Sequence, residues 1–187
     1  MFRYALAGAL MLSTVAAMAD GPSYSYIQAT YAEVELDAGG PFNVDGDGFG
    51  VAGSAAIGDS WYIFADYTTA ELESVLDLDL TTAGVGYHHA MSDKTDVFAE
   101  LGFAKIDVQF VGDDTGIAAR VGVRSMISEA LELTASVGTL EFDDVDYGTE
   151  FGAGLWYTVS GNFAIGADAH FADEVSRYGL GIRLFFD

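Results

Sequence analysis

The last ten residues, Tyr178–Asp187, read Tyr-Gly-Leu-Gly-Ile-Arg-Leu-Phe-Phe-Asp. Successive side chains of an extended strand point to opposite faces. One face of this stretch is therefore made of large apolar side chains, namely Tyr178, Leu180, Ile182, Leu184 and Phe186. The other face carries Gly179, Gly181 and Arg183. An apolar outside over a polar inside is typical of a strand in a closed barrel in lipid, because lipid offers no partner for backbone N–H and C=O groups.

The first nineteen residues have the pattern of an export signal. Arg3 gives a positive start, residues 5–17 are apolar, and Ala17-Met18-Ala19 is a small-x-small cleavage site. We therefore expect residues 1–19 to be removed, leaving one domain over residues 20–187. The alternative is an uncleaved anchor helix, which the short apolar stretch disfavours.

Composition and charge narrow the class of protein. The chain has no cysteine, so no disulfide framework supports the fold. An aromatic content of 13% and a mean hydropathy of +0.27 argue against disorder. The chain has twenty-nine acidic residues and only seven lysines and arginines, which gives a formal net charge of −22. This balance excludes ordinary nucleic-acid binding and disfavours docking onto an anionic membrane surface.

Ten segments have the alternation and length of tilted membrane strands. They cover residues 23–36, 46–57, 61–72, 78–89, 96–109, 116–127, 131–142, 147–159, 162–171 and 176–186. Tight connections at 58–60, 92–95, 128–130 and 160–162 alternate with five other loops. This order predicts an all-β fold, a transmembrane up-and-down antiparallel barrel of about ten strands with both termini on the periplasmic side. Eight strands is the alternative.

Charged residues gather on one face of the predicted strands. We expect them to form a charge network in the lumen, made of Asp66, Glu100, Arg120, Arg124, Glu132, Glu150, Asp168, His170, Arg177 and Arg183. A secreted β-sandwich would also alternate with period two. Its wet face usually carries lysine, whereas this chain places arginines in mid-strand and aromatic residues at strand ends, as a membrane barrel does.

Several short stretches resemble a known family. They are Ser23-Tyr24-Ser25-Tyr26-Ile27, Gly46-Asp47-Gly48-Phe49-Gly50, Phe64-Ala65-Asp66-Tyr67, Ala83-Gly84-Val85-Gly86-Tyr87, Ala119-Arg120-Val121-Gly122-Val123-Arg124 and the end of the chain. In layout the chain is similar to the porin-like and opacity-like outer-membrane β-barrel proteins of Gram-negative bacteria. The resemblance implies a location in the outer membrane. It also implies a C-terminal signal for the barrel-assembly machinery at Gly179, Ile182, Leu184 and Phe186. The family usually ends on an aromatic residue, whereas here Asp187 follows Phe186.

No set of residues meets the geometric requirements of catalysis. The best candidates are His170 with Asp168 and Ser176, or the pair His88 and His89. Adjacent histidines on a strand point to opposite faces and make a poor metal pair. We therefore expect no enzyme activity, no cofactor and no metal site. The expected function is a structural or surface-interaction role with a lumen filled by side chains, and the alternative is a narrow porin-like channel for small solutes.

Two further expectations concern charge pairing. Inside the barrel, Glu100, Arg124 and Glu132 should lie at one height and form ion pairs, as should Asp168 and Arg177 across the last hairpin. Outside, most acidic residues lie near the five longer loops, and we expect them to form a solvated, mutually repulsive surface. Outer-membrane lipid and lipopolysaccharide are the expected partners of a barrel in this membrane. Weak divalent cations are a further possible partner, with Asp143, Asp144 and Asp146 beside Asp113 and Asp114 as the place of binding.

Overall fold

The computed structural model describes residues 21–37, 43–72, 76–110, 112–142, 146–172 and 175–186. The predicted export signal and its cleavage site lie outside these residues. The described part of the chain forms ten strands: β1 (Tyr26–Asp37), β2 (Asn43–Ile57), β3 (Trp61–Leu72), β4 (Leu76–Ser92), β5 (Thr95–Val108), β6 (Gly112–Met126), β7 (Leu131–Phe142), β8 (Asp146–Ser160), β9 (Phe163–Phe171) and β10 (Val175–Phe185). None of these residues belongs to a helix long and apolar enough to cross a membrane.

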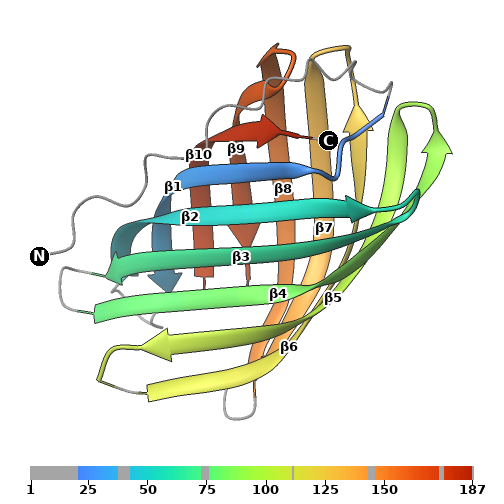
Figure 1. Ribbon diagram of the computed structural model, residues 1–187. Coiled ribbons are helices and arrows are strands. Elements are labelled where there is room, and N and C mark those ends of the chain that lie inside the picture. The colour runs from blue at the N-terminus through green and yellow to red at the C-terminus, as the bar shows by residue number, and fades with distance from the viewer. Residues whose placement is uncertain are drawn as a thin grey trace, which may run out of the picture.

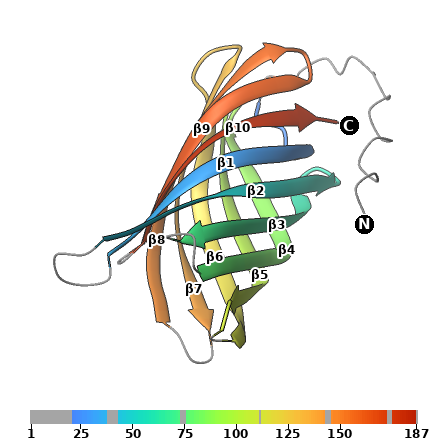
Figure 2. The same ribbon diagram turned by 90° about the vertical axis from the view of Figure 1, so that its left-hand side faces the viewer.

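Each strand pairs antiparallel with the next, and β10 closes the sheet onto β1. The closing register runs from Tyr26 opposite Phe185 to Leu36 opposite Val175. In Figure 1 strands β1 to β4 run across the view while β7 and β8 run steeply, and Figure 2 shows the opposite walls crossing in the same way. Such a crossing follows from the strand tilt that closure requires. The prediction of a ten-stranded antiparallel barrel is confirmed, and the eight-stranded alternative is wrong.

The connections define two ends of the barrel. Short turns at 58–60, 93–94, 127–130 and 161–162 lie at one end, called here the turn end, together with Ser25 and Phe186. Gly58 opens the first of these turns with φ of 76°, a conformation that favours glycine. β1, β3, β5, β7 and β9 end at the opposite end of the barrel, called here the loop end.

Large apolar side chains cover the outside of the barrel between two belts of aromatic residues. The belt nearer the turn end includes Trp61, Tyr87, Tyr157 and Phe186, and all four are exposed. The belt nearer the loop end includes Tyr31, Phe49, Tyr67, Phe103, Phe151, Phe171 and Tyr178, which are also exposed. Leu101, Leu155 and Ile182 lie between the belts and point outward. An apolar band between aromatic girdles is the surface that a barrel presents to lipid.

Beyond the second belt the polarity of the wall is reversed. Most exposed outward residues there are charged, namely Glu33, Glu35, Asp45, Asp47, Glu71, Asp77, Lys105, Asp107, Asp113 and Glu141. The inward residues are apolar and form two clusters. One contains Val34, Ala70, Leu72, Leu36, Val44 and Val175, and the other contains Ala104, Ile106, Phe142, Leu78, Leu80, Val108, Ala118 and Leu140. A water-exposed outside with an apolar inside is the pattern of a soluble barrel, so the strands extend past the lipid at the loop end.

Candidate functional site

The interior of the barrel is the candidate site, because nearly all the charged residues singled out in the sequence point into it. Eight of them line one interior cavity, namely Asp66, Glu100, Arg120, Arg124, Asp168, His170, Arg177 and Arg183. Glu150 lines a second cavity beside the first, and Glu132 contacts Arg124 and Arg183. The strand alternation that turns apolar residues to lipid turns these side chains inward.

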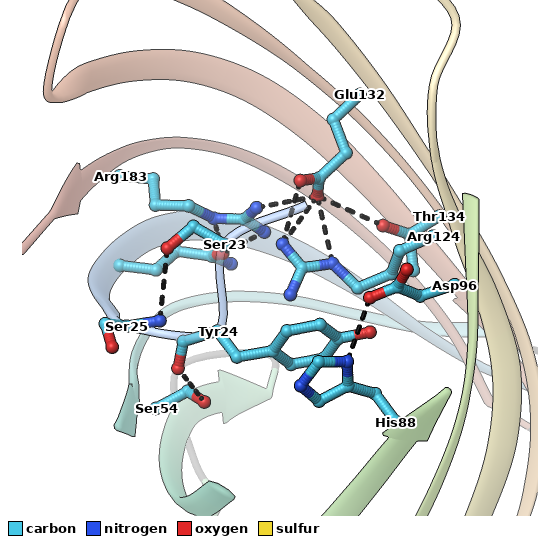
Figure 3. A network of polar contacts seen from close by, with 11 residues as sticks. Ser23, Tyr24, Ser25, Ser54, His88, Asp96, Arg124, Glu132, Thr134 and Arg183 are labelled. Atoms are coloured by element: carbon cyan, nitrogen blue, oxygen red, sulfur yellow. Dashed lines mark hydrogen bonds and ion pairs between the residues drawn. The ribbon is translucent and has the colours of Figure 1, made fainter. Parts of the chain in front are cut away.

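An aromatic layer fills the turn end of the lumen. Tyr24 precedes β1, is only 5% exposed, and inserts its ring between the walls (Figure 3). The ring stacks on His88 with 4.0 Å between ring centroids and lies 4.6 Å from the Tyr62 ring. Ser54 Oγ donates a hydrogen bond to the backbone oxygen of Tyr24 at 2.7 Å, and His88 Nδ1 lies 2.9 Å from Asp96 Oδ2. These contacts hold the segment before β1 inside the barrel.

An arginine–glutamate cluster lies against this aromatic layer. Arg124 Nη2 lies 2.8 Å from Glu132 Oε2, and Arg183 Nη1 lies 2.9 Å from Glu132 Oε1 (Figure 3). The guanidinium carbon of Arg124 lies 4.5 Å from the Tyr24 ring centroid, and that of Arg183 lies 4.1 Å from the Trp156 ring centroid. All three charged side chains are buried. One carboxylate and several aromatic faces, which include the Tyr26 ring 4.4 Å from the Arg183 guanidinium carbon, therefore stabilise two buried cations.

The middle of the lumen holds a second set of charges. Arg120 Nε donates to Glu100 Oε2 at 2.6 Å, and Tyr62 Oη donates to Glu100 Oε1 at 2.8 Å. His170 Nδ1 lies 3.0 Å from Glu150 Oε1, and its Nε2 lies 3.8 Å from Asp168. Side chains from neighbouring and facing strands thus meet inside the barrel.

Two expected ion pairs are corrected by the strand register. Glu100 does not share Arg124 with Glu132, because β5 and β6 place Arg120 directly opposite Glu100 and place Arg124 opposite Asp96. The expected pair of Asp168 with Arg177 does not form among the described residues. His170 lies opposite Arg177 in the last hairpin, and Arg177 Nη1 instead donates to Thr68 Oγ1 on β3 at 3.2 Å.

Glycines on the inner wall create room for the large rings. Tyr62, Phe98 and Trp156 each lie opposite a glycine of the neighbouring strand, at Gly86, Gly122 and Gly166. A Cβ atom added at Gly86 would lie 2.1 Å from the Tyr62 ring, and one at Gly166 would lie 2.5 Å from the Trp156 ring. These pairings were not found from the sequence, because they depend on the strand register.

Two cavities remain between these groups. The first has a volume of about 160 Å³ and the second about 70 Å³. They share Phe64, Asp66, Glu100, Arg120, His170 and Arg177 in their walls. The lumen is therefore neither an open pore nor a completely filled core.

The residues considered for catalysis are not brought together. Ser176 lies opposite Phe171 and faces outward, whereas Asp168 and His170 line the interior. His88 points inward to Asp96, and the adjacent His89 is exposed. The Ser176 hydroxyl therefore has no histidine base within reach among these candidate residues.

The remaining predicted residues lie in other parts of the wall. Gly179 is on the inner wall beneath Asp168, Ile182 and Phe186 face outward, and Leu184 pairs with Ile27 of β1. Asp143 and Asp144 lie outside the described residues. Asp113 pairs with Lys105 Nζ at 3.2 Å. Within the described ranges, no group of three or more His, Asp or Glu side chains is placed to hold a metal ion.

Comparisons with known proteins agree with this architecture. The family model described as "Outer membrane protein beta-barrel domain" matches residues 5–171. The chain therefore belongs to this family and is an outer-membrane β-barrel protein. No curated protein matches the chain in sequence.

Solved structures share the fold at low sequence identity. A KdgM porin in complex with disordered oligogalacturonate is 11% identical with a TM-score of 0.51, and the match covers 87% of this chain and 99% of that one. The translocator domain of the autotransporter NalP from Neisseria meningitidis is 11% identical with a TM-score of 0.50, over 88% of this chain and 89% of that one. The attachment invasion locus protein Ail of Yersinia pestis is 17% identical with a TM-score of 0.44, over 87% of this chain and 97% of that one.

Proposed function

We propose that this outer-membrane β-barrel is a non-enzymatic protein with a structural or surface-interaction role, whose lumen is closed to solute passage. The observation that carries the proposal is the closure of the turn end. Tyr24, the Arg124–Glu132–Arg183 cluster and Trp156 occupy one layer of the lumen, and their contacts join strands on opposite sides of the barrel. A small barrel whose interior is filled by interacting side chains offers no continuous path to water or ions.

The acidic extension at the loop end supports the surface role. Its outward carboxylates are exposed. On this proposal they face the cell exterior, where lipopolysaccharide and other molecules would meet the protein. Our proposal includes outer-membrane lipid and lipopolysaccharide as partners, with weak divalent cations bridging carboxylates to lipid phosphates. It also includes cleavage of an export signal at residue 19, both termini on the periplasmic side, and recognition of the last strand by the barrel-assembly machinery.

A narrow channel is the second candidate function, and the two interior cavities favour it. Their shared walls are mostly polar. The larger cavity reaches Tyr24 of the turn-end layer, and the smaller one reaches Leu80 and Leu140 of a loop-end cluster. Movement of a few side chains would have to connect them to both sides of the membrane. The two functions therefore differ in whether the turn-end layer opens.

Liposome swelling separates these functions. Refolded protein is placed in liposomes, and the uptake of a small sugar and of a small charged solute is followed by light scattering. We expect swelling no faster than in protein-free liposomes. Swelling that scales with the amount of folded protein would contradict the proposal and support the channel.

A further inference from the structure

Arg177 lines the interior cavities and, unlike the three other arginines there, forms no ion pair with a described carboxylate. Arg120 is paired with Glu100, and both Arg124 and Arg183 are paired with Glu132. Arg177 donates one hydrogen bond, to Thr68 Oγ1, and no carboxylate of the described residues lies within 4.0 Å of it. A guanidinium has five N–H donors. Most donors of Arg177 are therefore left for water or for a solute.

Two carboxylates in the same space also have unused acceptor positions. Asp66 lines both cavities and makes no hydrogen bond or ion pair with any other described residue. Asp168 lines the larger cavity, and its buried Oδ2 atom has no hydrogen-bond partner in the described part of the protein. Buried charges are stable only when they are compensated. Thr68, Asp66, Asp168 and Arg177 thus form a polar chamber. Among the described residues, Arg177 and Asp66 have no ion-pair partner within 4.0 Å, and Asp168 has only His170, at 3.8 Å.

The chamber has the size of a small molecule. The larger cavity measures about 160 Å³, and a cavity of about 150 Å³ is known to hold a benzene molecule. Tyr24 and Tyr62 form its floor at the turn end. The smaller cavity continues from it to Leu80 and Leu140 in the loop half of the barrel. A solute bound in the chamber would therefore lie between the Tyr24 layer and the apolar clusters of the loop end.

We propose that this chamber binds a small zwitterion. Its anionic group pairs with the guanidinium of Arg177, and its ammonium group donates to Asp66 and Asp168. A planar guanidinium binds a carboxylate through two parallel hydrogen bonds, and an ammonium offers three donors to the two carboxylates. A simple anion would leave both aspartates unpaired and would add negative charge, whereas a simple cation would leave Arg177 unpaired. This inference goes beyond the proposed function, because a closed barrel can bind a solute without passing it.

Calorimetry of the refolded wild-type protein in detergent tests the inference with a series of ligands. The probe is γ-aminobutyrate, and the comparisons are butyrate, butylammonium and the N-trimethyl analogue, which has no N–H donor. We expect one site for γ-aminobutyrate and binding weaker by about tenfold or more for each comparison ligand, because each lacks one charge-assisted set of hydrogen bonds. No heat from γ-aminobutyrate up to roughly 100 mM would show that water alone fills the chamber and would overturn the inference. Equal binding of the four compounds would overturn it as well.

Variants then locate the site. Arg177→Met and Asp66→Asn should each weaken γ-aminobutyrate binding by about tenfold or more. Lys105→Met, which removes an exposed cation outside the barrel, is the control and should bind like the wild type. Unchanged affinity in Arg177→Met would contradict the assignment. If the interior variants do not refold, the wild-type ligand series decides alone. Liposome swelling tests whether the lumen is closed, and calorimetry tests whether the chamber binds a zwitterion. The two proposals can therefore fail independently of each other.

Discussion

Arg183 on β10 reaches across the lumen to Glu132 on β7, with 2.9 Å between Nη1 and Oε1. Two further strands, β8 and β9, separate β7 from β10 along the wall. The ion pair therefore links parts of the barrel that share no backbone hydrogen bonds. Arg124 binds the same carboxylate from β6. Glu132 is thus the common anion of the turn-end layer.

The first prediction concerns this shared anion. Glu132→Gln leaves two buried guanidinium groups without a negative partner, so the free energy of unfolding should fall by about 3–5 kcal/mol. Arg124→Met should cost less, because Glu132 keeps Arg183 as its partner. Urea unfolding in lipid vesicles, followed by tryptophan fluorescence, measures both changes.

Glu129→Gln is the matched control, since Glu129 lies exposed in the turn before β7. It should unfold like the wild type. A smaller loss in Glu132→Gln than in Arg124→Met would contradict the shared role of Glu132.

The second prediction concerns the glycine beneath Tyr62. Gly86→Ala places a methyl group where the Tyr62 ring lies, at 2.1 Å, so the ring must move away from Glu100 and Tyr24. We expect a loss of about 1–3 kcal/mol from overpacking. The loss should shrink when Tyr62 is replaced by leucine, which a double-mutant cycle measures. Gly161→Ala, where nothing lies within 4 Å of the added Cβ, is the control. Equal losses at both glycines would show that ring displacement is not the cause.

Period-two alternation was sufficient to predict the strands, and it predicted the two faces in the lipid-facing part of the barrel. In β3 and β8 the predicted outward residues are all exposed, because lipid-facing strands carry the strongest contrast between their two faces. The turns were also found, since short Gly, Ser and Asp segments interrupt the alternation. Whether a side chain in this part of the barrel points to the lipid or to the lumen can therefore be predicted from the sequence.

Contacts that depend on the register between strands, or on a segment that turns away from the barrel wall, could not be predicted from the sequence. Residues 23–25 were expected to begin the first strand, yet β1 starts at Tyr26 and Tyr24 turns into the lumen. The partner of Glu100 depends on the β5–β6 register. The apolar interior of the loop end was also missed, because alternation continues there while the polarity of the two faces is reversed.

The third prediction concerns the lipid-facing band. Ile182 lies between the aromatic belts and is 46% exposed on the outside. Ile182→Arg should cost about 2–4 kcal/mol, because it places a charge in the lipid. Glu33→Arg is the matched test, since Glu33 also points outward but lies on the extension beyond the belt. It should fold into vesicles as well as the wild type. A large defect in Glu33→Arg would show that the lipid reaches further along β1.

The fourth prediction concerns repulsion on the acidic extension. Glu71 lies directly opposite Asp47 on β2 and Asp77 on β4, and directly opposed like charges destabilise a sheet. Glu71→Gln should raise the urea midpoint at low salt, and the gain should vanish at high salt because exposed charges are screened. If divalent cations bind this surface, Ca²⁺ should raise the melting temperature of the wild type more than that of Glu71→Gln. The same Ca²⁺ response in both proteins would show that Ca²⁺ does not bind at Glu71 and its neighbours Asp47 and Asp77.

The closed lumen is tested most directly by recording ionic current through the refolded wild-type protein in a planar lipid bilayer. The Tyr24 ring, the Arg124–Glu132–Arg183 cluster and Trp156 block the turn end, so we predict no stable conductance steps under conditions in which a known porin conducts. Uniform, long-lived current steps from correctly folded wild-type protein would contradict the account.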